Sequence, residues 1–305
     1  MSSSLQISVV ICTYNRAQYL PDALGSLYQQ TLPHDQFEVI VVDNNSTDQT
    51  KGVCEAFIAA HPDARFYYLS ETRQGASFAR NTGAATAKSP LLCFMDDDAI
   101  ADPDYLEKIV QFFIRHRDAG GLGGRIIPRY IPKEPVWMSH YVSSLVGHFH
   151  YSETVSVFAP NKYPLESNMI IRKADFDAIH GFNTALPGVM GTLRIGGEGK
   201  DFFFRLKALG RTVYYDPSIR VQHVVETAKL TREYMYRVAS GIGRGERVRT
   251  RQKGKYVYYL KILEYFFKLG ASLILGIKYT LQGKPAKALP VIYFRIDALK
   301  GLFNH

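Results

Sequence analysis

Three adjacent carboxylates, Asp96, Asp97 and Asp98, are the residues of this chain whose types and spacing most clearly indicate chemistry. They directly follow the apolar run from Leu91 to Met95, which is typical of a buried strand. Carboxylates this close repel one another unless a cation neutralises them, and oxygen ligands suit Mg²⁺ or Mn²⁺. Side chains alternate along an extended segment, so Asp96 and Asp98 are the expected pair of ligands. A solvated acidic turn is the alternative interpretation.

The carboxylates need a scaffold, and the first third of the chain predicts one by alternating strands and helices. Apolar runs at 7–12, 37–42 and 65–69 predict three strands ahead of the one that ends at Asp96. Helical patterns between the runs favour a parallel α/β sheet. Ligands of such sheets bind beyond the carboxyl ends of the strands, where this chain has polar residues: Thr13, Tyr14, Asn15, Asp43 and Asp96–Asp98.

Other classes of site are excluded by motifs that the sequence lacks. No glycine occurs between the first predicted strand and Gly25, so the G-x-G-x-x-G turn of dinucleotide-binding proteins is missing, and no P-loop occurs. Without that turn, Asp43 does not read as the ribose-binding acid of a dehydrogenase. The three cysteines, Cys12, Cys54 and Cys93, lack metal-ligand spacing and are expected to be free thiols.

The middle of the chain, 120–225, is irregular, but four elements are expected in it, of which the first two are strands over 120–129 and 164–172. The segment 196–206 opens a predicted helix, which begins near Lys200 and ends at Gly210. Val213–Tyr215 predicts a short strand that stops at the turn signal Asp216-Pro217. His223 follows this turn.

Positive charge is concentrated at the end of the chain. Residues 229–305 contain 16 Lys and Arg against 4 Asp and Glu, a net charge of +12, so the total of +9 leaves −3 for residues 1–228. Glycines and arginines at 241–251 indicate a basic, mobile linker. The apolar and aromatic segments 256–277 and 286–303 predict amphipathic helices that suit a membrane interface, with a helical hairpin packed on protein as the alternative.

Short segments of the chain, taken in order, resemble glycosyltransferase family 2. The resemblance covers residues 5 to about 250. Each segment is weakly specific alone, whereas the order and spacing of all of them are strongly specific. The segments are Val9–Arg16, Val41–Asp48, Gly75–Asn81, Asp96-x-Asp98, Ser167–Met169, Gly181-Phe182, Glu198–Leu206 and His223.

The resemblance implies a GT-A fold, a Rossmann-like α/β architecture with a mixed, mainly parallel sheet flanked by helices. A C-terminal helical appendage would follow it. The implied catalytic domain spans 1–228, with a nucleotide-sugar half over about 1–100 and an acceptor half over about 101–228. The remaining residues, 229–305, would form the basic and amphipathic region.

The activity implied by the resemblance is transfer of a sugar, with inversion, from a nucleoside diphosphate sugar to a hydroxyl acceptor, with UDP favoured. An ion, Mg²⁺ or Mn²⁺, at Asp96 and Asp98 would stabilise the leaving diphosphate. His223 would complete the metal site, with a packed histidine as the alternative. Arg80 would hold the ribose or diphosphate, with a helix-surface arginine as the alternative. The expected donor-binding residues are Thr13, Tyr14, Asn15, Arg16, Asp43, Arg80, Asp96 and Asp97, of which Asp43 would accept the N3–H of a uracil ring.

The catalytic base is the point at which the chain departs from the family pattern. The acceptor hydroxyl must lose its proton to a carboxylate opposite the leaving group. Many relatives carry Glu-Asp where this chain has Glu198-Gly199, and the Asp is usually assigned as the base. Glu198 is the first candidate here and Asp201 the second. An acidic residue that merely favours the helix start is the alternative for Glu198.

The resemblance also implies partners. A glycan or lipid-linked acceptor is expected, in polysaccharide or glycolipid synthesis, with the C-terminal region on a membrane surface. The short polar segment before Ile7 predicts no signal peptide, so a cytoplasmic enzyme peripheral to the inner face of the membrane is expected. A nucleotide-sugar-binding protein without turnover is one alternative, because Gly199 replaces an acid. A nucleic-acid-binding protein is another, which the aliphatic runs of the basic tail disfavour.

Overall fold

The computed structural model describes residues 5–304, which form two compact units. Unit 1 contains the described residues up to Ile127, Phe149–Thr184 and Gly199–Val224. Unit 2 contains Pro128–His148, Ala185–Glu198 and the described residues from Val225 onward. The domain boundaries expected at 228 and near residue 100 stay predictions. Two segments of the expected catalytic domain belong to unit 2, namely 128–148 and 185–198.

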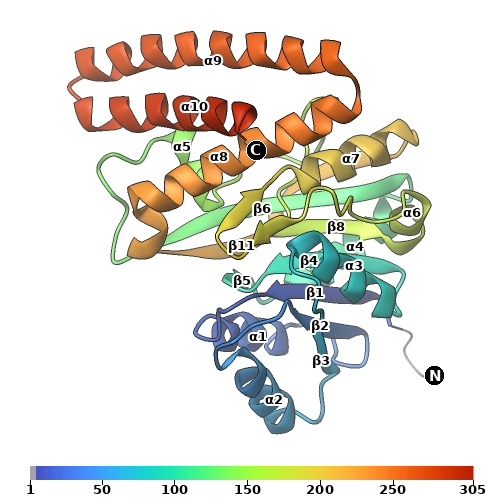
Figure 1. Cartoon of the computed structure of the whole chain (residues 1–305). Coiled ribbons are helices and arrows are strands. Elements are labelled where there is room, and N and C mark those ends of the chain that lie inside the picture. The colour runs from blue at the N-terminus through green and yellow to red at the C-terminus, as the bar shows by residue number, and fades with distance from the viewer. Residues whose placement is uncertain (1–4, 305) are drawn as a thin grey trace. The chain divides into compact units, whose positions relative to one another are not determined.

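A nine-stranded mixed sheet is the central element of unit 1. Figure 1 labels most of its strands. Its strand order is β3-β2-β1-β4-β8-β6-β11-β5, with β7 paired to β11. The first four strands are parallel, while β8 is antiparallel to both β4 and β6, and β11 is antiparallel to both β5 and β7. The strands are β1 (Ile7–Thr13), β2 (Phe37–Asp43), β3 (Phe66–Ser70), β4 (Leu91–Asp96), β5 (Ala99–Ala101), β6 (Ala119–Ile131), β7 (Ser156–Val157), β8 (Asn168–Arg172) and β11 (Thr212–Glu226).

The central strands are apolar on both faces because helices cover both sides of the sheet. Along β1, Val9 and Ile11 belong to one core cluster and Val10 to another, as the two-residue alternation of a strand requires. Residues of α1, α2 and α4 join the first cluster, and residues of α3, α6 and α7 join the second. The helices are α1 (Leu20–Tyr28), α2 (Thr50–Ala60), α3 (Ala76–Thr86), α4 (Tyr105–Arg115), α6 (Lys173–Ala178) and α7 (Glu198–Ala208). The predicted mixed α/β fold is therefore confirmed.

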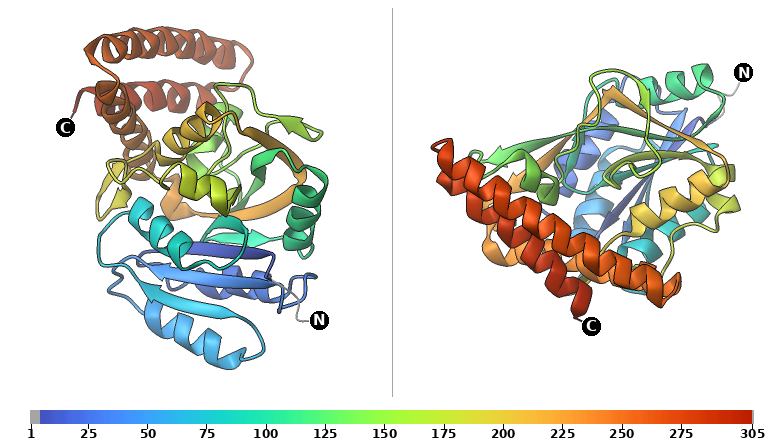
Figure 2. Two further views of the ribbon diagram at one scale, coloured as in Figure 1. Left: turned by 90° about the vertical axis from the view of Figure 1, so that its right-hand side faces the viewer. Right: turned by 90° about the horizontal axis from the view of Figure 1, so that it is seen from above.

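Three long helices dominate unit 2 and lie together as the orange to red ribbons of Figure 2. They are α8 (Arg232–Gln252), α9 (Lys255–Leu281) and α10 (Ala288–Phe303). Val238 of α8 and Val291 of α10 share a buried cluster with Val142 of the short α5. The smaller elements are α5 (His140–Ser143), η1 (Ser144–Val146), β9 (Gly188–Met190), β10 (Leu193–Ile195), η2 (Thr227–Leu230) and η3 (Pro285–Lys287). Among the described residues, none of the helices has the length and apolarity needed to cross a membrane.

The prediction of a mobile linker at 241–251 is wrong, because these residues form the second half of α8. Their glycines let other backbone segments approach the helix. A Cβ added at Gly243 would overlap the Ala298 carbonyl of α10, and one at Gly301 would overlap the Ser240 carbonyl. Glycine costs helix stability in an isolated helix, but here the side chain is missing so that α8 and α10 can pack backbone to backbone.

The prediction of a short strand at 213–215 is also wrong, because β11 continues to Glu226. Asp216-Pro217 lies within the strand instead of ending it. The Asp216 carboxylate accepts hydrogen bonds from the Ser218 N–H at 2.8 Å and from the Ser218 hydroxyl at 2.7 Å. This local bonding lets the strand pass through a turn signal and reach His223.

Candidate active site

The carboxyl ends of β1, β2 and β4 meet at one edge of the sheet. In the register of the parallel strands, Thr13 lies beside Asp43, and Cys12 lies beside Asp96. Each strand ends with polar residues because the apolar run that buries it stops there. The edge therefore gathers the loops that the sequence predicted to bind a ligand.

Asp96, Asp98 and His223 converge at this edge. Asp98 directly precedes β5, whose Ala99 pairs with His223 on β11, so strand pairing brings the histidine to the carboxylates. His223 Nε2 lies 3.0 Å from Asp98 Oδ1, and one ligand atom from each of the three residues lies within 4.8 Å of the others. Two carboxylates and an imidazole suit a divalent cation such as Mn²⁺ or Mg²⁺. The donor set thus fits the predicted ion.

Two arginines face the acidic cluster. Arg16 contacts Asp98 and lies 3.5 Å from Asp97 Oδ1, and Arg80 lies 3.9 Å from Asp96 Oδ1. The Asp98 side chain is 3% exposed, whereas that of Asp96 is 38% exposed and so is partly buried and partly open to solvent. An ion bound between buried Asp98 and partly exposed Asp96 could therefore also coordinate a ligand that enters from solvent.

Burial disfavours the charged carboxylates of this cluster. Burial and the Asp98 charge raise the pKa of Asp96, while Arg80 and His223 oppose the shift. Burial also raises the pKa of Asp97 to about 7, against the opposing charge of Arg16. Because charges of one sign are crowded here, a bound cation would favour ionised aspartates.

The loops after β1 and β2 are tied together by the residues expected to hold the nucleotide. Buried Asp43 accepts hydrogen bonds from the Ser46 N–H at 2.9 Å and the Tyr68 hydroxyl at 2.8 Å. Asn15 accepts from the Thr47 N–H at 2.7 Å, so its side chain holds the loops together. Thr13 is buried and Tyr14 half-buried beside them. The sequence did not point to Tyr68, whose role depends on β2 and β3 pairing.

The carboxylates predicted as the base have different surroundings. Glu198 is buried as the first residue of α7. Asp201 accepts a hydrogen bond from Arg205 Nε at 2.8 Å, and Arg205 also donates to the carbonyl of Gly181 at 2.8 Å. Asp201 thus orients Arg205, which anchors α7 to a neighbouring turn. Glu166, which the sequence did not single out, accepts a hydrogen bond from the Gly199 N–H at 2.7 Å.

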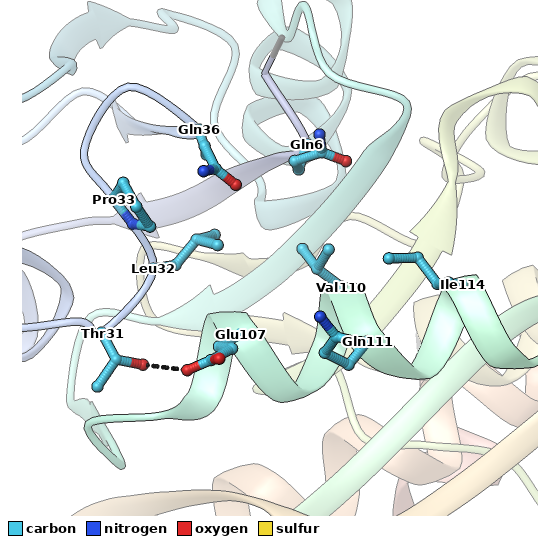
Figure 3. Close-up of a pocket in the computed structure, with 9 residues that line it drawn as sticks. All are labelled: Gln6, Thr31, Leu32, Pro33, Gln36, Glu107, Val110, Gln111 and Ile114. Atoms are coloured by element: carbon cyan, nitrogen blue, oxygen red, sulfur yellow. Dashed lines mark hydrogen bonds between the residues drawn. The ribbon is translucent and has the colours of Figure 1, made fainter. Parts of the chain in front are cut away.

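Unit 1 also has a pocket whose lining residues are not those of the acidic cluster (Figure 3). Gln6 and Gln36 line it just before β1 and β2 begin, together with Val110 and Ile114 of α4. It therefore lies at the amino ends of strands whose carboxyl ends carry the acidic cluster.

The mixed sheet of unit 1 thus has, at the carboxyl ends of its parallel strands, a carboxylate and histidine cluster that could hold a divalent cation, with two arginines beside it. The family model "Glycosyl transferase family 2" matches residues 8–179, more than half of the chain. The chain belongs to glycosyltransferase family 2 and is an enzyme of the glycosyl-transfer class, as the sequence resemblance implied.

Named relatives and solved structures agree with this assignment. The chain is 24% identical over 228 residues to the glucosyl-dolichyl phosphate glucuronosyltransferase of Haloferax volcanii, covering 72% of this chain and 69% of the relative. It is 40% identical over 106 residues to a validoxylamine A glucosyltransferase of Streptomyces hygroscopicus subsp. jinggangensis, covering 34% of this chain and 24% of that one.

Among solved structures, the mannosyltransferase PcManGT of Pyrobaculum calidifontis, determined with GDP-Man and Mn²⁺, has a TM-score of 0.67 at 18% identity. The match covers 98% of this chain and 87% of that chain. Residues 1–349 of S. aureus TarS, determined with UDP, give a TM-score of 0.55 at 19% identity, covering 98% and 89%. These likenesses confirm the fold.

Proposed function

We propose that this enzyme transfers a sugar, with inversion, from a UDP-sugar to a hydroxyl of a glycan or lipid-linked acceptor. The observation that carries the proposal is the convergence of Asp96, Asp98 and His223 at the carboxyl edge of the sheet. A neighbour in fold was crystallised with a nucleotide sugar and Mn²⁺, which supports a divalent ion here. The relative that acts on a dolichyl phosphate sugar supports a lipid-linked acceptor.

In this proposal different residues of unit 1 bind different parts of the donor. Asp96, Asp98 and His223 would hold Mn²⁺ or Mg²⁺, which when bound supplies positive charge to the leaving diphosphate. Arg80, 3.9 Å from Asp96, is positioned to bind a phosphate oxygen or the ribose. Arg16 would hold Asp97 and Asp98 in place through its ion pairs.

Thr13, Tyr14, Asn15 and Asp43 would form the nucleobase end of the donor site. A carboxylate at Asp43 can accept a ring N–H, which uracil and guanine present and adenine does not. TarS, a neighbour in fold, was solved with UDP, which favours uracil. Burial and the bond to Asp43 raise the pKa of Tyr68, so its hydroxyl stays protonated and keeps donating to that carboxylate.

A donor panel tests this assignment through thermal stability. With Mn²⁺ present, UDP-glucose or UDP-N-acetylglucosamine should raise the melting temperature by about 5 °C at one hundred times its dissociation constant, because ligand binding stabilises the folded state by about 2.7 kcal/mol. ADP-glucose is the matched control and should give no shift. A shift with GDP-mannose alone would contradict the choice of UDP, and no shift with any donor would contradict the proposed function.

We also propose that α9 contacts a membrane surface, because this helix exposes many large apolar side chains. Part of its polar stripe lies inward, because Ser272 is buried and Lys261 lies 3.5 Å from Glu246 of α8, while Glu264 pairs with both Lys261 and Lys268. Tyr258 and Tyr265 are also buried, but many large apolar residues of the helix are exposed: Tyr256, Tyr259, Leu263, Phe266, Phe267, Ile274, Ile277 and Leu281. An apolar face with nearby lysines suits an anionic lipid interface.

Substituting two residues of this face tests the membrane contact. Phe267 and Ile274 are 79% and 71% exposed, so Phe267→Glu/Ile274→Glu should fold normally. Co-sedimentation with phosphatidylglycerol-containing vesicles should fall at least about tenfold, because each large apolar side chain contributes about 1.5–3 kcal/mol when buried. Val136→Glu, at an 81% exposed site, is the control. Wild-type protein that ignores vesicles, or a double variant that binds them equally well, would contradict the proposal.

A further inference from the structure

The carboxylate of Glu166 lies against the start of α7. It accepts the Gly199 N–H at 2.7 Å. A Cβ added at Gly199 would overlap the carboxylate, so Glu166 occupies the space that a side chain at position 199 would take. Gly199 does not have a positive φ, so its backbone does not require glycine. A side chain at position 199 would therefore have to displace Glu166.

The strand pairing fixes Glu166 at the edge that carries the acidic cluster. β8 begins at Asn168, which pairs with Met95, the residue before Asp96. Because β8 is antiparallel to β4, the residues that lead into β8 lie at the carboxyl end of β4. Glu166 is two residues upstream of Asn168. Burial, Asp98 and, more weakly, the charge of Glu166 all raise the pKa of Asp96, as expected for carboxylates close to one another.

Asn168 fixes the position of the chain segment that leads into β8. Its side-chain amide donates to the carbonyls of Arg125 at 3.1 Å and Ile219 at 3.2 Å, and its oxygen accepts from the Tyr105 hydroxyl at 2.9 Å. Asn168 is fully buried, so three other segments hold the entrance to β8. A side chain placed two residues before such an anchor has a well-defined position, as a reacting group needs.

The order of the strands puts Glu166 on the side of the acidic cluster that is opposite to β1 and β2. In the sequence β2-β1-β4-β8, Thr13 and Asp43 lie on one side of Asp96, and the entrance to β8 lies on the other. A donor held by β1 and β2 would place its leaving diphosphate toward those strands and the cluster. The attacking hydroxyl would then approach from the side of β8. Glu166 is half-buried there, so solvent reaches part of it.

From this geometry we infer that Glu166 is the general base of the transfer reaction. The inference rests on the proposed function. Glu166 takes the proton of the acceptor hydroxyl while the acceptor oxygen forms a bond to the anomeric carbon. The bond from that carbon to the diphosphate oxygen breaks on the opposite face, and its electron pair leaves with the diphosphate. The Gly199 N–H orients the carboxylate, and Asp201 stays in its ion pair with Arg205.

The test uses water as the acceptor and measures release of UDP from the UDP-sugar that gives the largest thermal shift. Glu166→Gln keeps an oxygen that can accept the Gly199 N–H but cannot take a proton. Its kcat should fall about 10²- to 10⁴-fold while the donor dissociation constant is unchanged. A purely structural Glu166 predicts nearly wild-type kcat in this variant. Asp177→Asn, at an exposed carboxylate of α6, is the control.

A compensating pair strengthens the test. Glu166→Ala removes the carboxylate and frees the space next to Gly199, so Glu166→Ala/Gly199→Asp returns a carboxylate to the same contact from the other chain segment. The double variant should release UDP at least about tenfold faster than Glu166→Ala alone. Full kcat in Glu166→Gln would overturn the inference. So would a loss of kcat in Glu198→Gln or Asp201→Asn while the Glu166→Gln variant keeps its kcat. Absence of turnover in wild-type protein with every donor would instead overturn the proposed function, and the inference with it.

Discussion

Asp98→Asn is expected to lower the rate of sugar transfer by about 10³-fold or more. The substitution keeps the shape of the side chain but removes the charge of the most buried carboxylate in the cluster. An ion held there would supply several kcal/mol of stabilisation to the charge that develops on the diphosphate, and about 4 kcal/mol corresponds to 10³ in rate. The measurement is UDP release in the presence of Mn²⁺.

Asp104→Asn is the matched control for this variant. Asp104 lies at the start of α4 and pairs with Lys108 at 2.8 Å, with its side chain 45% exposed. Its loss should leave the rate within about twofold, because exposed ion pairs contribute little. Wild-type turnover in a folded Asp98→Asn enzyme would refute the ion site, and an equal loss in both variants would indicate a general effect of surface charge.

Gly245→Ala is expected to destabilise the enzyme by about 3 kcal/mol or more, the largest stability change that the structure predicts for a single methyl group. The added Cβ would overlap the carbonyl of Gly196, and the Gly196 N–H is itself bonded to the Gly241 carbonyl at 3.0 Å. Overpacking usually costs about 1–3 kcal/mol, and a backbone neighbour cannot rotate away. The urea midpoint of unfolding measures the change.

The control substitution is expected to change the free energy of unfolding in the opposite direction. Gly270 lies in the middle of α9 and a Cβ there would meet nothing within 4 Å, so Gly270→Ala should stabilise the helix by about 1 kcal/mol. If the two substitutions shift the midpoint in the same direction, the close packing of α8 against the segment before Gly197 is not what decides stability. A stable Gly245→Ala variant would also contradict the packing.

The sequence predicted the parallel half of the sheet because its signals are local. Apolar runs identify β1, β2 and β4 without reference to distant residues, and Asp96 and Asp98 follow from where the last run stops. The meeting of these strand ends then follows from the general geometry of parallel sheets. The family pattern singled out His223, and the structure brings it to Asp98, although the strand that carries it was predicted to end at Tyr215. Its role as a metal ligand stays a prediction.

The features that the sequence did not predict depend on contacts between distant segments. Glu166 joins the edge through the antiparallel pairing of β8 with β4, and a lone glutamate before an apolar segment gives no local sign of this. The glycines of α8 indicated a loop because glycine disfavours helices, whereas packing against α10 reverses that preference. In α8, contact between distant segments overrides the local propensity. The position of Glu166 also depends on such a contact, for which the sequence has no local signal.

Calorimetry of UDP binding tests the central claim most directly. If Asp96, Asp98 and His223 hold an ion that contacts the diphosphate, wild-type protein should bind UDP with Mn²⁺ and lose at least about tenfold in affinity with EDTA. Asp98→Asn should bind UDP equally weakly in both conditions. A wild-type affinity for UDP that is the same with Mn²⁺ and with EDTA would contradict the account.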